Sequence, residues 1–187
     1  MDAGPYRSAF LLLRDDIRQL TAYVEPTDDN LSVYSHRLYE ILLRASTEFE
    51  SLCREQLAST GYSKPTHDQN INDYRTLEAS LHLEACSVGV HLWRPTPRYV
   101  KPFLDWSTAT PPLHWYDAYN QVKHNRNTNF PRANLGNALS AVAGLFVILC
   151  RLQILPGDVA FTQVRNTPDY EEHIFPICPE LTLVLPK

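Results

Sequence analysis

The sequence predicts a mainly α-helical protein with a small β element. Two long segments, residues 31–59 and 133–154, carry apolar side chains at helical spacing, whereas alternation typical of strands is confined to short runs. The 187 residues fit one domain and are enough to bury an ordinary core. We therefore expect residues 1–187 to form a single domain, with a helical core over about 5–154 and a C-terminal extension over about 155–187.

The overall composition excludes several classes of protein. Hydrophobic residues make up 44% and charged residues 20% of the chain, which is typical of a globular domain and unlike a disordered, collagen-like or coiled-coil chain. The net charge of −4 argues against a broad nucleic-acid-coating surface, but it is compatible with a local basic patch. The N-terminus lacks the features of a signal peptide, and the longest apolar run, residues 138–150, is shorter than the roughly 20 residues of a membrane span. We expect a cytoplasmic protein without membrane contacts.

The N-terminal part of the chain is expected to form two long helices. Apolar residues at steps of three and four turn one face of residues 5–24 toward the core. Pro26 ends this helix, because the residue before a proline disfavours the α conformation. Side-chain oxygens within residues 27–30 are then expected to cap the second helix, over 31–59.

The middle of the chain has weaker signals. Asn70 or Asn72 is expected to cap a short helix over about 73–80, and alternating apolar residues predict a strand within 86–93. Five prolines between residues 95 and 112 are interleaved with aromatic residues. Linkers are rarely so aromatic, so this segment indicates a packed, irregular excursion.

The C-terminal part is expected to contain a helix over 113–126, a break at 127–131 and a last helix over 133–154. The last helix is apolar nearly all round, which places it either at the centre of a bundle or in a subunit interface. We expect it to mediate a homodimer. Beta-prone runs at 159–164 and 181–185 predict a small hairpin.

One segment concentrates polar side chains that are suited to catalysis. On a helix over 113–126, the side opposite the core and the final turn carry Asp117, Asn120, Lys123, His124 and Arg126. An imidazole exchanges a proton near neutral pH, and a neighbouring cation can hold a phosphate or stabilise a pentavalent transition state. These groups suit metal-independent cleavage of RNA, in which the 2′-hydroxyl supplies the nucleophile.

The catalytic hypothesis gives each of these residues a role. His124 transfers the proton, Lys123 and Arg126 contact the phosphate, Asn120 orients the imidazole or the phosphate, and Asp117 fixes the histidine tautomer. The structural alternative is that the cations simply interact with the helix macrodipole, which favours positive charge at a C-terminus.

The arrangement resembles the HEPN superfamily, whose members are compact helical domains with a polar histidine motif at the start or end of a late helix. The resembling part is the string Asn120-x-x-Lys123-His124-x-Arg126, followed by a break and an apolar helix. The nuclease motif of the superfamily has an arginine a few residues before the histidine, whereas residues 117–119 contain none. If His124 is catalytic, Arg126 or Lys123 must supply that charge.

The resemblance covers about residues 31–154 and is strong only at 113–150. It implies a helical bundle in which a segment of the second helix, with Arg44, Glu48 and Glu50, supplies a supporting acidic residue, and we expect Arg44 and Glu48 to support the motif. Many members are metal-independent RNases of toxin–antitoxin, phage-defence and CRISPR-associated systems, and they dimerise to bring two motifs together. The resemblance therefore implies RNA as a substrate, a homodimer and a cognate protein partner. The alternative is a non-catalytic, dimeric interaction or scaffold module of the same fold.

Other candidates favour structural roles. Arg75 and His82 have the spacing of the superfamily motif, but they straddle a predicted change from helix to strand. His36 and Glu40 fit an ordinary surface pair at i, i+4. The histidines lack metal-binding spacing and there is no glycine-rich phosphate loop, so no metal or cofactor is expected. The four separated cysteines are expected to be reduced thiols, and the aromatic residues within 93–116 to pack the core rather than stack on bases.

Overall fold

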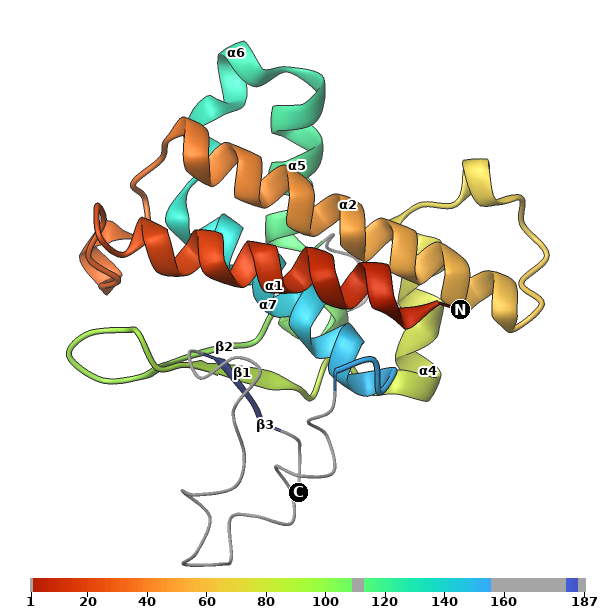
Figure 1. The fold of residues 1–187 in the computed structure, drawn as a ribbon. Coiled ribbons are helices and arrows are strands. Elements are labelled where there is room, and N and C mark those ends of the chain that lie inside the picture. Colours follow the sequence, from red (N-terminus) through yellow and green to blue (C-terminus); the bar gives the residue numbers. More distant parts are fainter. Residues whose placement is uncertain (1, 109–112, 156–180, 185–187) are drawn as a thin grey trace, which may run out of the picture.

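The computed structural model describes residues 2–108, 113–155 and 181–184 (Figure 1). Within these residues the helices are α1 (Ala3–Leu20), α2 (His36–Ser59), α3 (Ile71–Tyr74), α4 (Glu78–Leu81), α5 (His114–His124), α6 (Arg126–Asn129) and α7 (Leu135–Arg151). The strands are β1 (Ser87–Val90), β2 (Arg98–Val100) and β3 (Leu181–Val184). The predicted fold class, mainly α-helical with a small β element, is therefore confirmed.

The central helix of the bundle is α7, which packs against α1, α2 and α5 (Figure 1). Every residue from 138 to 150 is buried within one chain, as the apolar character on all faces of this helix predicts. Of the two expected positions, the structure selects the centre of the bundle. Because these side chains are already covered, the expectation that α7 forms a subunit interface is corrected.

Both N-terminal helices are shorter than predicted. The first ends at Leu20, and a turn leads to the buried Pro26. The second begins at His36, because the Ser35 hydroxyl accepts a 3.2 Å hydrogen bond from the backbone N–H of Leu38 and caps this turn. The predicted caps in residues 27–30 instead belong to a single turn of 3₁₀-helix, η1 (Asp28–Asn30).

The segment that leads into α2 is fixed against the start of α7. Tyr34 and Asn134 form an antiparallel β-bridge. Next to it, the backbone N–H groups of Leu135 and Gly136 donate to the carbonyl oxygens of Val33 at 2.9 Å and Leu31 at 3.0 Å. The first turn of α2 is therefore anchored at a defined place on the bundle.

The middle segment is more regular than predicted. The short helix expected over 73–80 is a succession of α3, a 3₁₀ turn and α4, and Asn70 caps it in a capping box with Asp73. The strand expected within 86–93 is β1. The proline-rich excursion adds an unpredicted strand, β2, and a 3₁₀ turn, η4 (Leu104–Ser107).

The sheet has the order β2-β1-β3, and both pairings are antiparallel. In the register of the second pair, Val88 lies opposite Leu183, whose side chain is buried. The predicted strand over 181–185 is thus confirmed as β3, but its described partner is β1 and not a second strand of a local hairpin. The other run expected in that hairpin, residues 159–164, lies outside the described residues.

Aromatic side chains from the proline-rich excursion and α5 fill one side of the core. Trp93, Phe103, Trp106, Trp115 and Tyr116 are all buried, which confirms core packing over base stacking for this group. Tyr99 is the exception, with 60% of its surface exposed. The indole of Trp115 donates to the Pro102 carbonyl at 2.8 Å and so fixes α5 to this segment.

Three of the cysteines, Cys53, Cys86 and Cys150, are buried free thiols, and Cys178 lies outside the described residues. Across residues 2–108, 113–155 and 181–184, no three His, Cys, Asp or Glu side chains converge in a way that suits a metal ion. None of the helices in the described part of the chain combines the length and the hydropathy of a membrane span.

Candidate functional site

The polar segment singled out in the sequence lies at the end of α5, and its core-facing side is as predicted. Trp115, Ala118, Tyr119 and Val122 are all buried. The helix ends at His124, because the backbone leaves the helical conformation at Asn125, with φ −145° and ψ 74°.

The break after α5 comes earlier than the expected 127–131. The Asn129 side chain donates to the Asn125 carbonyl at 3.1 Å and thereby stabilises the turn between α5 and α6. As a consequence, Arg126 begins α6 instead of projecting from the last turn of α5. This places Arg126 on a different helix from His124, with only Asn125 between them.

His124, the proposed proton-transfer group, is exposed. Asn120, one turn earlier in α5, is half-buried. Neither side chain makes a hydrogen bond or an ion pair with another residue in the described part of the chain. Both are therefore accessible to a ligand without the loss of an existing bond.

Lys123 is held as a cation beside His124. Its Nζ donates a 2.9 Å hydrogen bond to the hydroxyl of Tyr119 and lies 4.8 Å from the centroid of that ring. The hydrogen bond to Tyr119 raises the pKa of Lys123, and the charge of Glu50 acts in the same direction. The end of α5 thus retains a fixed positive charge at neutral pH.

Asp117 has partners other than His124. Its Oδ2 accepts hydrogen bonds from Gln121 at 2.8 Å and from Arg132 at 3.0 Å. Arg132 belongs to η5 (Phe130–Arg132), so this ion pair connects α5 with the segment before α7. In this arrangement Asp117 positions Arg132. Its hydrogen bonds do not include His124, so the expected contact that would fix the tautomer of His124 is not formed.

Arg126 contacts a histidine that is far away in the sequence. Its Nη2 lies 2.8 Å from Nδ1 of His36, the first residue of α2. A guanidinium can only donate, so Nδ1 is the acceptor and a neutral His36 carries its proton on Nε2. The guanidinium also lies over two aromatic rings, 4.9 Å from the centroid of Tyr39 and 5.2 Å from that of Phe130.

The interpretation of His36 as a surface partner of Glu40 is wrong. Glu40 instead accepts a 2.9 Å hydrogen bond from Arg37, which also donates to Asp16 of α1. Sequence reasoning missed His36 because its contact with Arg126 depends on the tertiary packing of α6 beside α2. The sequence does carry a signal for the position of the Arg126 guanidinium. Arg126 and Phe130 are at i, i+4, a spacing that suits a cation–aromatic pair on one side of a helical turn.

The supporting residues expected from the resemblance, Arg44 and Glu48, lie on the α1 side of α2. Arg44 donates to the carboxylate of Asp16 in α1. Burial raises the pKa of Glu48, the charge of Arg44 opposes this shift, and Glu48 in turn raises the pKa of Tyr6 in α1. The acidic residue of α2 that faces α5 is Glu50, so the structure does not bring Arg44 and Glu48 to the polar segment.

The alternative pair, Arg75 and His82, occupies structural positions in the fold. Arg75 donates to the carbonyl oxygens of Trp106 at 2.7 Å and Thr108 at 2.9 Å, and so ties the short helices to the proline-rich segment. His82 caps α4 in the left-handed conformation, with φ 49°.

The end of the bundle around α5 and α6 is basic although the chain carries a net charge of −4. No Asp or Glu occurs between Asp117 and Asp158. The exposed side chains there include Lys123, His124 and Arg126, and the charge of Asp117 is compensated by Arg132. This end of the molecule therefore attracts anions.

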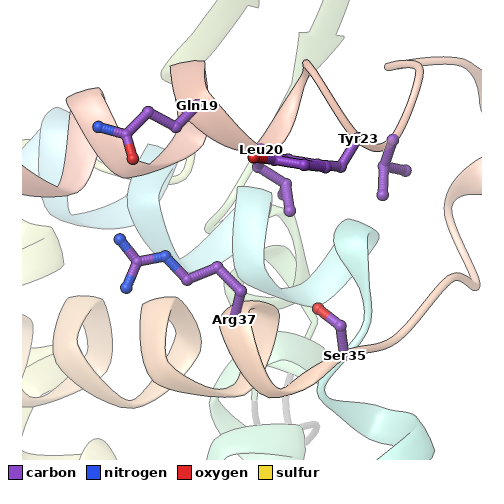
Figure 2. A pocket seen from close by; sticks show the side chains of 6 residues that line it. Gln19, Leu20, Tyr23, Ser35 and Arg37 are labelled. Carbon is purple, nitrogen blue, oxygen red and sulfur yellow. The ribbon is translucent and has the colours of Figure 1, made fainter.

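A separate hollow of about 400 Å³ opens between the end of α1 and the start of α2 (Figure 2). In the view of Figure 2, Leu20 and Tyr23 lie on one side, and Arg37 and Ser35 lie on the other. The guanidinium of Arg37 is already engaged by Asp16 and Glu40. The lining is mainly apolar and includes none of the polar residues of α5 or α6.

No family model matches this chain, and neither a curated protein sequence nor a solved structure is significantly similar to it. The resemblance to the HEPN superfamily therefore stays an expectation that is based on the motif alone.

Proposed function

We propose that this protein binds RNA at the basic end of the bundle and cleaves it without a metal ion, with His124 as the proton-transfer group. The observation that carries the proposal is the exposed, unengaged imidazole of His124, which lies between the cations Lys123 and Arg126 in the sequence. An imidazole can accept a proton near neutral pH, and flanking cations stabilise the charge that develops on a phosphate.

In the proposed reaction, His124 accepts the proton of a ribose 2′-hydroxyl. The 2′-oxygen forms a bond to the adjacent phosphorus, the bond from phosphorus to the 5′-oxygen breaks, and that oxygen takes a proton from water. The products are a 2′,3′-cyclic phosphate and a 5′-hydroxyl, and the imidazolium returns its proton to solvent. Lys123 and Arg126 neutralise the phosphate, and Asn120 orients the imidazole or the phosphate.

A non-catalytic interaction module is the second candidate. It is favoured by the engagement of Arg126 with His36, Tyr39 and Phe130, which gives this cation a structural partner. Cations at the end of α5 also interact favourably with the helix macrodipole.

For both candidate functions the proposal includes a cytoplasmic location, a homodimer and a cognate protein partner. Light scattering in solution tests the dimer.

In the deciding experiment, total RNA is incubated with the protein in the presence of EDTA. The rate of RNA cleavage is compared between the wild type and His124→Ala. The matched control is His67→Ala, which removes another exposed histidine from a different part of the chain. We expect His124→Ala to slow cleavage by about 10²–10⁴-fold, the usual contribution of a general base, and His67→Ala to have no effect.

Circular dichroism establishes that both variants are folded. Equal cleavage by wild type and a folded His124→Ala variant would refute the role of His124. If the wild type binds RNA without cutting it, the interaction module is the better description.

A further inference from the structure

The described residues contain a second set of aromatic side chains, which lies at the edge of the core at the basic end of the bundle. They come from the start of α2 with the residues just before it, and from α6 with the residue just after it. The set comprises Tyr34, His36, Tyr39, Arg126 and Phe130, and is called the aromatic–basic cluster below.

Phe130 lies at the centre of the cluster. Its ring centroid is 5.5 Å from that of Tyr34 in an edge-on arrangement at 83°, 4.9 Å from that of His36 at 42°, and 6.2 Å from that of Tyr39 at 63°. These are favourable distances for aromatic pairs. The rings therefore support one another and form a defined surface.

The outer part of the cluster is accessible, whereas Tyr39 and Phe130 are half-buried against the core. Tyr34 has 49% of its surface exposed, and His36 and Arg126 are also exposed. The backbone of Tyr34 is held by its β-bridge to Asn134, so this exposed ring stands on a fixed support. An accessible ring that is held in place loses little conformational entropy when a planar ligand stacks on it.

Arg126 adds a phosphate-binding group to the aromatic surface. Its guanidinium has five N–H donors, and His36 is the one hydrogen-bond acceptor that it meets among the described residues. The other donors are therefore available to the oxygen atoms of a phosphate. The sequence on either side of Arg126, from residue 118 to residue 157, contains no carboxylate that would compete with a phosphate for this guanidinium.

We infer that the aromatic–basic cluster is a stacking platform for the bases of single-stranded RNA. One base packs against the exposed ring of Tyr34, and the adjoining phosphate binds Arg126, two residues from His124 along the chain. This inference rests on the proposed function and specifies its substrate class. Bases of single-stranded RNA have accessible faces that stack on aromatic side chains, whereas those of an A-form duplex are covered by their neighbours.

The test is binding of a short, fluorescently labelled oligouridine with 2′-O-methyl groups, which cannot be cleaved, measured by anisotropy in EDTA. Tyr34→Ala is compared with Tyr23→Ala, which removes a tyrosine that is 87% exposed at the end of α1, next to the hollow. Since one stacked base contributes about 1–3 kcal/mol, we expect Tyr34→Ala to weaken binding by about 5- to 150-fold. Tyr23→Ala should bind like the wild type, and Tyr34→Phe should retain most of the affinity.

A duplex of the same length and chemistry should bind more weakly and show no response to Tyr34→Ala. Arg126→Ala provides an independent variant if Tyr34→Ala disturbs the bridge to α7. It should weaken binding and reduce its salt dependence, whereas its control Arg7→Ala, in the first turns of α1, should do neither.

The outcomes separate the inference from the proposed function. If oligouridine binding is unchanged by both Tyr34→Ala and Arg126→Ala, or if the duplex binds as tightly as the single strand, the platform is refuted. Cleavage that depends on His124 would survive that result. Absence of binding to either RNA by the wild type would overturn the platform, and absence of cleavage in the separate assay would overturn the proposed catalysis.

Discussion

The hydroxyl of Tyr116 donates a 2.5 Å hydrogen bond to Oε1 of Glu50, and this buried contact joins α5 to α2. Arg54 lies one turn further along α2 and donates to the other carboxylate oxygen at 3.3 Å. The candidate site lies at the end of α5. Its position therefore depends on a polar link inside the bundle as well as on apolar packing.

Removal of the Tyr116 hydroxyl should destabilise the fold. In Tyr116→Phe the buried carboxylate of Glu50 loses a donor, and leaving a buried polar group unsatisfied costs about 1–3 kcal/mol. Urea denaturation should show this loss, while the control Tyr23→Phe, at an exposed position, should match the wild type. An unchanged unfolding free energy in Tyr116→Phe would mean that the link contributes nothing.

Stability should fall at alkaline pH because of buried tyrosines. Burial raises the pKa of Tyr6 and Tyr74 to about 12 from an ordinary value of 10.0, and it also raises the pKa of Tyr116. Above about pH 10 the unfolded chain therefore binds fewer protons than the folded chain, which favours unfolding. Each such tyrosine should lower the unfolding free energy by about 1.4 kcal/mol per pH unit until it ionises in the folded state.

Urea midpoints measured from neutral pH to about pH 12 test this dependence. The contribution of these groups should be complete below about pH 10 and be lost toward pH 12. Tyr74→Phe should show a smaller slope than Tyr23→Phe. A flat profile over this interval would contradict the burial of these phenols.

A methyl group at Gly144 should disturb the contact between α7 and α5. The added Cβ would lie 3.0 Å from Cζ2 of Trp115, whose indole is fixed by its hydrogen bond to Pro102. Overpacking of this kind costs about 1–3 kcal/mol, which exceeds the gain of about 1 kcal/mol in helix propensity. Gly144→Ala should therefore lower the melting temperature.

Gly136→Ala is the matched control on the same helix. Its added Cβ would come no closer than 3.4 Å to Leu31, so the gain in helix propensity should dominate. A stabilised Gly144→Ala variant would show that the packing around Trp115 relaxes easily.

Arg132 should matter for RNA through the carboxylate that it neutralises. In Arg132→Ala, Asp117 retains its bond to Gln121 but loses the cation at 3.0 Å, which leaves an uncompensated negative charge near the proposed RNA site. We expect RNA binding to weaken by about 2- to 10-fold. This loss is larger than the one caused by removing one positive charge at a remote site.

The second substitution Asp117→Asn should restore most of this affinity in the Arg132→Ala background. Arg98→Ala, which breaks the ion pair with Asp28 near β2, is the control and should bind RNA normally. A double variant that binds no better than Arg132→Ala would assign the effect to the guanidinium itself.

Apolar periodicity was sufficient to predict the helical core but not its boundaries. Burial of Leu135, Leu139 and Val142 follows directly from their spacing, because a helix presents every third or fourth residue to the same side. The start of α2 could not be located in this way, since residues 27–30 and Ser35 all offer capping oxygens. The bridge between Tyr34 and Asn134 settles it, and this bridge is a tertiary contact.

The candidate site was predictable only where it is local in sequence. The buried stripe of α5 follows from helical geometry, as does the outward direction of His124. The contact of Arg126 with His36 joins residues of two helices, and no periodicity within either helix encodes it. The same limit applies to Glu48 and Glu50, because only tertiary packing decides that Glu48 lies on the α1 side of α2 and that Glu50 contacts α5.

The position of β1 between β2 and β3 imposes an order on folding during synthesis. β1 and β2 are close in sequence, whereas β3 follows every other described element, including the central α7. During translation the helices can pack before β3 emerges, and until then the second edge of β1 lacks its hydrogen-bond partner. An unpaired strand edge is a template for association with other chains. The need for a chaperone should therefore be greatest while the chain is still on the ribosome and β3 has not yet paired with β1.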